Sequence, residues 1–282
     1  MTIQTRVGQI IEGDNRFLGR STFEDWSHRL TAPSDGLMAA LGVPELSTQS
    51  REVFRLLALC LTSPDARVWP LKLTRLLSSH GDPLAGYFGA QLVSAGRVMG
   101  PGTATHAARG LVFVGQQVHA YGDSDDAIAV AVARWRAQAG GRFAGFGVPF
   151  RAEDERRVGL LRLVEGGPLA QGRYWRLHLR VVAAMAPLQP NCVIALTALL
   201  LDIGVRPERC GMAFSVCMAH MYLAHALESA EQDGARLHSL PADAVDYQGI
   251  PARRLSEPGA PASAHAALQR HPSAILEGTP PC

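Results

Sequence analysis

The sequence predicts an all-α fold, and three observations support this prediction. Apolar residues recur at helical spacing along much of the chain, the ends of these stretches carry residues that start and stop helices, and strict two-residue alternation is scarce. Only the segment 111–122, LVFVGQQVHAYG, leaves the choice between helix and strand open. The length of 282 residues allows one large domain or two smaller ones.

Two helices are expected in the first quarter of the chain. Ser21 with Glu24 three residues later forms a capping box, which predicts a helix start in the segment 21–30. After Ser50, apolar residues occupy one helical face, at Val53, Leu56, Leu57, Cys60 and Leu61. This spacing predicts an amphipathic helix packed on a core.

Three further helices have clear boundaries. Asp125 and Asp126 favour the positive end of a helix, and Gly140 stands where a left-handed cap would end it. The segment 191–204 is apolar nearly all round, which predicts a central helix. The segment 207–234 begins with a proline and ends at a glycine, so a helix is expected there too.

Charge and hydropathy exclude some classes of protein. The 27 Lys and Arg residues nearly balance 25 Asp and Glu residues, which argues against a nucleic-acid partner. The longest apolar or small run, residues 192–201, is shorter than the roughly 20 residues of a bilayer span, so we expect no membrane protein. The first residues lack the features of an export signal, which predicts a cytoplasmic location.

The cysteines and histidines do not predict a metal site. The five cysteines include no C-x-x-C pair, so we expect free, mostly buried thiols. His220 and His225 are five residues apart, whereas ligands on one helix are four apart. From about residue 256 the chain is rich in Pro, Ala and Ser without periodicity, which predicts a flexible tail over 256–282.

Five short motifs follow one another between residues 65 and 249. They are the segment 78–111 that passes through G-P-G, a G-x-G-x-P turn (Gly145, Gly147, Pro149) with Asp154 and Arg156 behind it, Pro190 and Asn191 before an apolar helix, A-H-A-L-E at residues 224–228, and Tyr247 with Gly249. In this order they resemble motifs of the citrate synthase superfamily, in particular its short citryl-CoA lyase-like members.

The resemblance implies a homodimer of two-domain subunits with a citrate synthase-like fold. A large helical domain would consist of residues 1–105 and 206–255, and a smaller domain of residues 106–205 would bind coenzyme A (CoA) and close over it. The implied CoA-binding residues are Gly145, Gly147, Pro149 and Arg151. The implied substrate-binding residues are Arg156, Asn191 and Met218, although Met218 stands where the family often has arginine.

The implied chemistry is condensation of acetyl-CoA with a keto acid, or cleavage of the equivalent citryl thioester. Such a reaction needs a base for the proton alpha to the thioester carbonyl and a donor that stabilises the enolate. It also needs a second donor on the keto group and arginines that bind carboxylates. No metal is implied.

This chain departs from the family at its catalytic positions. Val148 stands in place of the histidine that polarises the keto group, and Val193 in place of the aspartate base. An ungapped comparison puts Thr103 at the enolate-stabilising histidine, whereas a three-residue insertion would put His106 there. Because valine neither gives nor takes a proton, we do not expect the standard reaction.

Three other residues are candidates for catalysis: His106, His80 and Cys192. Each has a structural alternative, since a lone histidine is often structural, His80 lies at a helix and turn boundary, and a buried cysteine is inert.

Two functions therefore stay open. The first is an enzyme that acts on a CoA thioester and a second substrate less charged than oxaloacetate. The second is a catalytically inactive scaffold or binding protein. We favour the enzyme because a CoA-binding turn without a use is harder to explain.

Overall fold

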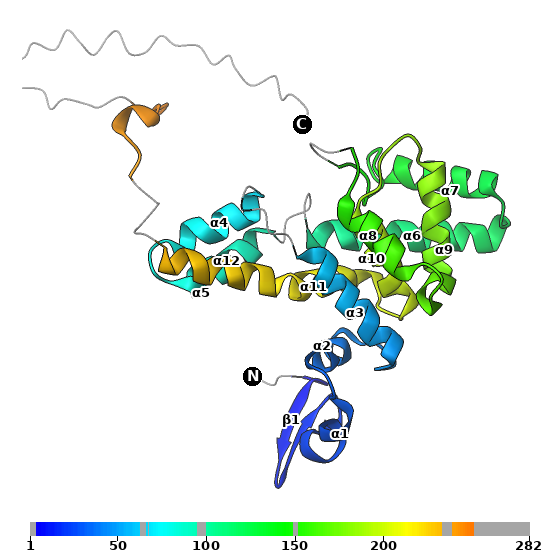
Figure 1. Cartoon of the computed structure of the whole chain (residues 1–282), viewed down its shortest axis with the longest axis horizontal. Helices are drawn as coiled ribbons and strands as arrows, with labels where there is room; N and C mark the ends of the chain where they lie inside the picture. The colour runs from blue at the N-terminus through cyan, green and yellow to red at the C-terminus, as the bar shows by residue number, and fades with distance from the viewer. Residues whose placement is uncertain are drawn as a thin grey trace, which may run out of the picture. The chain divides into compact units, whose positions relative to one another are not determined.

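The computed structural model describes residues 4–62, 66, 68–94, 100–148, 152–232 and 239–250 (Figure 1). The chain divides into two compact units, Met1–His238 and Ser239–Cys282. Within the described part of the second unit, residues Ala242–Ala244 form the short 3-10 helix η3. The predicted tail over 256–282 lies outside the described residues.

The first unit is built almost entirely of helices, so the all-α prediction is confirmed. Its helical segments are, in chain order, η1 (Thr22–Trp26), α1 (Ser27–Arg29), α2 (Pro33–Leu41), α3 (Thr48–Leu61), α4 (Trp69–Ser78), α5 (Pro83–Ser94), α6 (Pro101–Tyr121), α7 (Asp125–Gln138), α8 (Glu155–Val164), η2 (Pro168–Gln171), α9 (Arg173–Ala184), α10 (Cys192–Asp202), α11 (Pro207–Cys217) and α12 (Ala219–Glu231). The segment 111–122, which sequence left open, is helical and lies mostly in α6.

A small antiparallel sheet precedes these helices and was not predicted. Its strands β1 (Gly8–Ile11), β2 (Asp14–Phe17) and β3 (Arg20–Ser21) pair in the order β1-β2-β3. Gly13 and Gly19 have positive φ angles, which permit the tight turns between the strands. The strands are short and mostly exposed, so they lack the alternation of buried residues by which a strand is recognised.

The predicted helix boundaries agree with the structure at most positions. The Ser21 hydroxyl accepts a hydrogen bond from the Glu24 N–H at 3.2 Å. The Asn191 side chain caps α10 by accepting from the N–H of Val193 at 3.0 Å. The single helix expected over 207–234 is instead divided into α11 and α12, which meet at Met218.

The main core lies between α3 and the helices from α6 to α11. Nine residues of α10 are buried, as its apolar composition predicted, and the whole predicted apolar face of α3 is buried. Helices α6 and α11 approach closely at Gly211, where a Cβ atom would lie 2.5 Å from the Pro101 carbonyl oxygen. This approach needs glycine because any side chain would collide with the neighbouring backbone.

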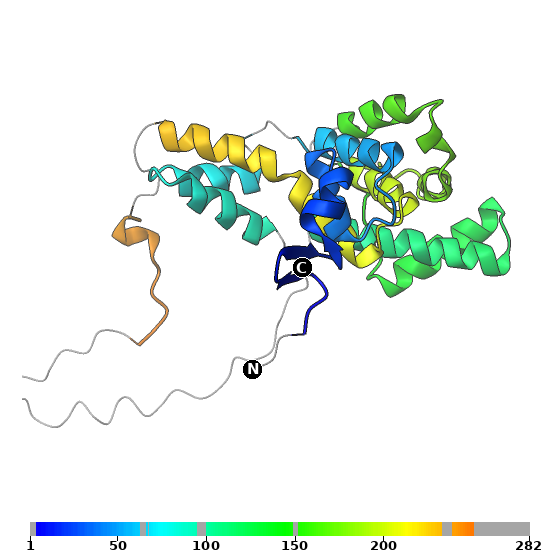
Figure 2. The ribbon, with the colours of Figure 1, turned by 90° about the horizontal axis from the view of Figure 1, so that it is seen from below.

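A second, smaller core joins α4, α5 and α12, which lie side by side (Figures 1 and 2). It contains Leu71, Ala90, Met221 and Tyr222. The Tyr222 hydroxyl is 2.9 Å from the hydroxyl of Ser94 on α5. These contacts hold the three helices as one packed group.

The predicted domain boundary between residues 105 and 106 falls inside the continuous helix α6. The main core contains residues of both predicted domains, for example Leu56 of α3 and Leu196 of α10. The division into a large and a small domain therefore stays a prediction.

Helices α11 and α12 together form a longer apolar stretch than sequence indicated. Pro207–Glu231 has 25 residues, and its most apolar 18-residue window has a mean hydropathy of 1.3, which by length and composition alone would allow a membrane crossing. In the structure, 44% of that window is buried. The sequence analysis missed the stretch because scattered polar residues interrupt it.

Candidate active site

The G-x-G turn is held by the segment that precedes α10. The Gly147 N–H donates to the carbonyl of Gln189 at 2.7 Å, and the Asn191 N–H donates to the carbonyl of Gly145 at 2.9 Å. The Asn191 side-chain amide donates to the carbonyl of Gly147 at 3.1 Å. Two motifs that are 44 residues apart in the sequence thus form one hydrogen-bonded unit.

The two glycines of this turn have different surroundings. Gly145 has a φ of +93°, and a Cβ atom there would lie 2.6 Å from the Cβ of Ile194. Gly147 has a φ of +97°, but a Cβ atom would meet no atom within 4 Å. Gly145 is therefore required both by its backbone angle and by the close contact with α10, and Gly147 by its angle alone.

Asp154 connects the start of α8 to the start of α10. Its carboxylate accepts hydrogen bonds from Nε and Nη2 of Arg156, each at 2.9 Å, and from the Cys192 N–H at 2.8 Å. It also caps α8 by accepting from the Arg156 N–H at 3.1 Å. Burial raises the pKa of this carboxyl, but the hydrogen bonds from Arg156 and Cys192 outweigh it and lower the pKa to about 2.

The structure gives the predicted substrate-binding residues structural contacts. Arg156 is engaged in the bidentate pair with Asp154. Both polar atoms of the Asn191 side chain are occupied, one by the cap of α10 and one by the G-x-G turn. Met218 packs between the main core and the smaller core. The three residues therefore do not form one binding surface, and none of them lines the cavity described next.

A cavity of about 450 Å³ opens beside the G-x-G turn, and it has the size of a small-molecule site. Thr103 and His106 line it from α6, and Gly145 and Gly147 line it from the turn. Its other lining residues are Trp135, Arg136, Ala139, Gly141, Arg142, Phe143, Ala144, Phe146, Met185 and Leu188. The structure thus brings two predicted CoA-binding glycines together with both alternatives for the enolate-stabilising residue.

Thr103 and His106 lie one helical turn apart, so both reach the cavity from the same face of α6. Among the residues that the structure describes, the lining includes no carboxylate, and His106 is its imidazole, the side chain that serves most often as a general acid or base. His106 is exposed, whereas Thr103 is half-buried. The cavity can therefore supply one acid–base group and one neighbouring hydroxyl.

The other lining residues include three aromatic rings and two arginines. The ring centroids of Trp135 and Phe143 are 6.4 Å apart, and those of Phe143 and Phe146 are 5.8 Å apart. Arg136 is partly fixed, because its Nε donates to the carbonyl of Gly141 at 3.1 Å. Sequence reasoning missed Arg136 and Arg142 because they precede the glycine motif. The available signal was that both arginines lie within ten residues of that motif in the sequence.

Several predicted site residues lie elsewhere. Val148 and Val193 are half-buried, and Val193 packs against the main core. Neither valine lines the cavity. Pro149 and Arg151 lie outside the described residues. His80 is exposed at the end of α4, in the group formed by α4, α5 and α12, and does not line the cavity either.

The structure argues against a nucleophilic role for Cys192. Its side chain is fully buried, and this burial raises the pKa of the thiol far above its ordinary value, so the thiol stays protonated at neutral pH. The other described cysteines, Cys60, Cys210 and Cys217, are also buried. In the part of the chain that the structure describes, no three His, Cys, Asp or Glu side chains gather in a way that could hold a metal ion.

Three solved structures share this fold. Citryl-CoA lyase from Hydrogenobacter thermophilus superposes with a TM-score of 0.71 and 16% identity, over 90% of this chain and 98% of the other. ATP citrate lyase from Methanothrix soehngenii superposes with a TM-score of 0.63 and 17% identity, over 89% of this chain and 42% of the lyase chain. Citrate synthase from Thermotoga maritima superposes with a TM-score of 0.54 and 17% identity, over 76% of this chain and 58% of the synthase chain.

No protein-family model and no curated protein sequence matches the chain. The structural likeness shows that the chain has a citrate synthase-like fold, as its motifs predicted. Among the three relatives, the citryl-CoA lyase is matched along nearly its whole length, whereas this chain spans less than half of the ATP citrate lyase.

Proposed function

We propose that this protein binds a CoA thioester in the His106 cavity and makes or breaks a carbon–carbon bond on it, with a second substrate less charged than oxaloacetate. The observation that carries the proposal is that His106 and the predicted CoA-binding turn line the same cavity. The M. soehngenii ATP citrate lyase, which has this fold, was solved in complex with citrate and coenzyme A. That complex supports CoA as the ligand.

The charges of the cavity suit CoA. Arg136 and Arg142 line it together with the aromatic wall of Trp135, Phe143 and Phe146. Guanidinium groups bind phosphates well, and CoA carries several. We therefore assign the phosphates of CoA to these two arginines and its thioester to the end of the cavity near His106.

In the proposed reaction, His106 takes the proton alpha to the thioester carbonyl. The hydroxyl of Thr103 lies one turn away on α6 and donates a hydrogen bond to the enolate oxygen that forms. The enolate carbon then adds to a carbonyl carbon of the second substrate, the π bond of that carbonyl opens, and its oxygen takes the proton that His106 holds. In the cleavage direction the same groups act in reverse. A cavity without carboxylates and with a largely apolar wall favours a second substrate that has few charges.

The first test is exchange of the alpha protons of acetyl-CoA with deuterium from D₂O, followed by mass spectrometry. This reaction needs no second substrate. We expect exchange in the unaltered protein, loss of at least about a hundredfold in His106→Gln, and a smaller loss in Thr103→Val. Arg180→Gln serves as control, because Arg180 pairs with Asp123 and Asp125 and does not line the cavity.

Calorimetric titration with CoA separates binding from chemistry. We expect micromolar binding that Arg142→Gln weakens by about tenfold, more strongly at low salt than at high salt. Arg156→Ala is a poor probe of binding, because it would leave Asp154 without its partner and disturb the fold. Absence of any binding of CoA or acetyl-CoA would overturn the proposal.

A catalytically inactive binding protein is the second candidate. The observation in its favour is that the lining residues in the described part of the chain include no carboxylate, the group expected as the base. Binding of acetyl-CoA without any deuterium exchange would favour this candidate over the enzyme.

We also propose that the protein forms a homodimer through α5 and α12. Leu84, Phe88 and Leu92 recur at every fourth residue on α5 and are 63%, 58% and 78% exposed. Leu223 and Leu227 of α12 are exposed at the same spacing. Large exposed apolar patches of this kind mark interfaces. Light scattering should give a dimer for the unaltered protein and a monomer for Leu92→Glu, and a monomeric unaltered protein would contradict the proposal.

A further inference from the structure

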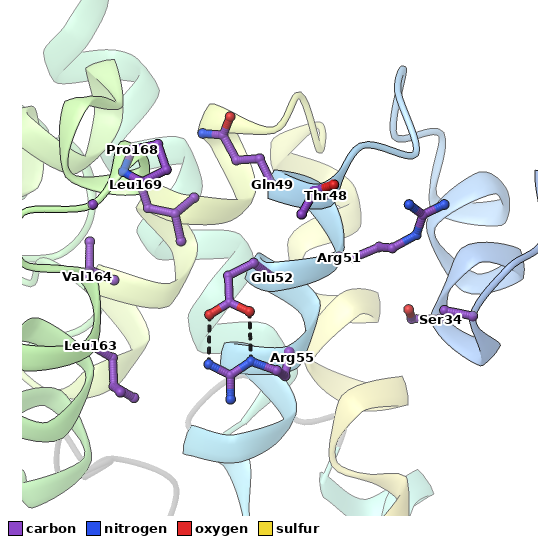
Figure 3. A pocket seen from close by; sticks show the side chains of 12 residues that line it. Ser34, Thr48, Gln49, Arg51, Glu52, Arg55, Leu163, Val164, Pro168 and Leu169 are labelled. Carbon is purple, nitrogen blue, oxygen red and sulfur yellow. Dashed lines mark hydrogen bonds and ion pairs between the residues drawn. The ribbon is translucent and has the colours of Figure 1, made fainter.

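A second cavity lies between α3 and the segment formed by α8 and η2 (Figure 3). Its volume of about 700 Å³ is within the range of small-molecule sites. It shares no lining residue with the His106 cavity. Its lining residues are Ala32, Ser34, Thr48, Gln49, Arg51, Glu52, Arg55, Leu163, Val164, Gly167, Pro168 and Leu169.

One wall of this cavity carries a pair of opposite charges. Both guanidinium nitrogens Nε and Nη2 of Arg55 donate to the carboxylate of Glu52, each at 2.7 Å. The side chain of Arg55 is 56% exposed and that of Glu52 is 40% exposed, so both charges are accessible from the cavity. The two residues are one turn apart on α3.

The opposite wall is apolar. Figure 3 shows Leu163, Val164, Pro168 and Leu169 on α8 and η2, across the cavity from the Glu52–Arg55 pair. Leu163 is exposed, so it presents apolar surface to the cavity that no other part of the described chain covers. A ligand that fills the cavity would therefore bury apolar area on one side and meet charges on the other.

Arg51 is the remaining charged residue of the lining, and it already forms an ion pair outside the Glu52–Arg55 pair. Its guanidinium bonds the buried carboxylate of Asp35, at 2.8 Å from Nε and 3.2 Å from Nη2. Figure 3 shows its side chain pointing away from the Glu52–Arg55 pair. Glu52 and Arg55 are thus the charges left to recognise a ligand.

The pairing of these charges determines which ligand fits. An anion that bonded Arg55 would have to compete with Glu52, and a cation at Glu52 would have to compete with Arg55, so a ligand with one charge gains little from this exposed pair. A molecule that carries both an ammonium and a carboxylate group can satisfy both at once. We propose that this cavity is a binding site for an apolar α-amino acid, whose charged groups meet Glu52 and Arg55 and whose side chain packs on Leu163 and Leu169.

The test is calorimetric titration of the full-length protein with L-leucine and L-phenylalanine. Two analogues of leucine form the matched series: N-acetyl-L-leucine lacks the ammonium charge, and L-leucine amide lacks the carboxylate. We expect at least one amino acid to bind, and each single-charge analogue of leucine to bind about ten to a hundred times more weakly than leucine. Equal binding of leucine and either analogue would overturn the assignment of a zwitterion.

Variants locate the site. Glu52→Gln and Arg55→Gln should each weaken amino-acid binding by about tenfold or more, and Leu163→Ser by a smaller factor. An exposed pair of this kind adds little to stability, so these variants should stay folded, which circular dichroism would verify. Arg180→Gln, which removes another ion-paired arginine outside the cavity, should bind as the unaltered protein does.

Two results would overturn the proposal. One is the absence of binding for both amino acids at millimolar concentration. The other is binding that none of the three cavity variants changes. Neither result would bear on the His106 cavity, because CoA titration and deuterium exchange test that site with different residues.

Discussion

The Asp154 network beneath the G-x-G turn and the His106 cavity beside it contrast in their use of polar groups. In the network, the carboxylate of Asp154 is buried and bonded to Arg156 and to the backbone of Cys192. In the cavity, His106 is exposed among aromatic, small and arginine residues, and no carboxylate is found among the lining residues that the structure describes. One region uses its charges for the fold, whereas the other keeps a single acid–base group accessible.

This contrast indicates a structural role for motif residues that were expected to bind ligands. Asn191, Arg156 and Gly145 belong to the citrate synthase-like pattern, and in this chain all three hold the turn and the two helix starts together. Their presence is therefore explained by the fold. The cavity contains Thr103 and His106, the two alternatives for the pattern's enolate-stabilising histidine, so a proposal about chemistry has to start from the cavity.

The largest effect is expected from Asp154→Ala, which tests whether the network carries the fold. The change leaves the partly buried Arg156 without its partner and removes the cap of α8, so the free energy of unfolding should fall by about 3 to 5 kcal/mol. Urea denaturation measures this. Asp123→Ala, which breaks an exposed pair with Arg180, is the control and should cause no resolvable loss. Equal effects of the two changes would refute the contrast.

The two glycines of the turn provide a sharper comparison. Gly145→Ala combines a positive φ with a contact at 2.6 Å to Ile194 and should lower the free energy of unfolding by about 3 kcal/mol. Gly147→Ala has the same backbone strain but open space, and should cost about 1 kcal/mol. Thermal unfolding of both variants checks the order. A larger loss of stability in Gly147→Ala than in Gly145→Ala would show that the turn is not in close contact with α10.

Acid should weaken the network in a defined range of pH. Folding lowers the pKa of Asp154 from 3.8 to about 2, so its stabilisation is complete above about pH 5, declines as the pH falls below 4, and is largely lost at about pH 2 and below. The shift corresponds to about 2 kcal/mol of the free energy of unfolding. Urea denaturation of the unaltered protein and of Asp154→Asn from pH 5 to pH 2 should give two curves that converge in acid. Curves that stay parallel would contradict this pKa.

The smallest effect concerns the four described cysteines, all of which are buried and one of which, Cys192, begins α10. In a Cys282→Ser variant, the four buried cysteines should not react with a thiol reagent in the native protein, and all four should react after denaturation. The absorbance of the chromophore that the reagent releases gives the number of cysteines that have reacted. Rapid native labelling, mapped to Cys192 by mass spectrometry, would restore that residue as a candidate nucleophile and remove the contrast between network and cavity.

Local signals in the sequence predicted several of the helices. The apolar face of α3, the capping residues Ser21 and Asn191 and the left-handed Gly140 each act within a few residues, so spacing alone revealed them. The same signals missed the strands from Gly8 to Ser21, which are too short and too exposed to show a pattern. They also missed the division of α11 from α12 at Met218.

The order of the motifs determined the citrate synthase-like fold, but only the tertiary structure decided which of their residues meet. His106 reaches the G-x-G turn because α6 packs beside it, 39 residues earlier in the chain than Gly145. Arg156, expected at a substrate, is instead bound by Asp154. Such contacts depend on packing between distant segments and on competition among nearby polar groups, and neither is encoded in the spacing of residues along one helix.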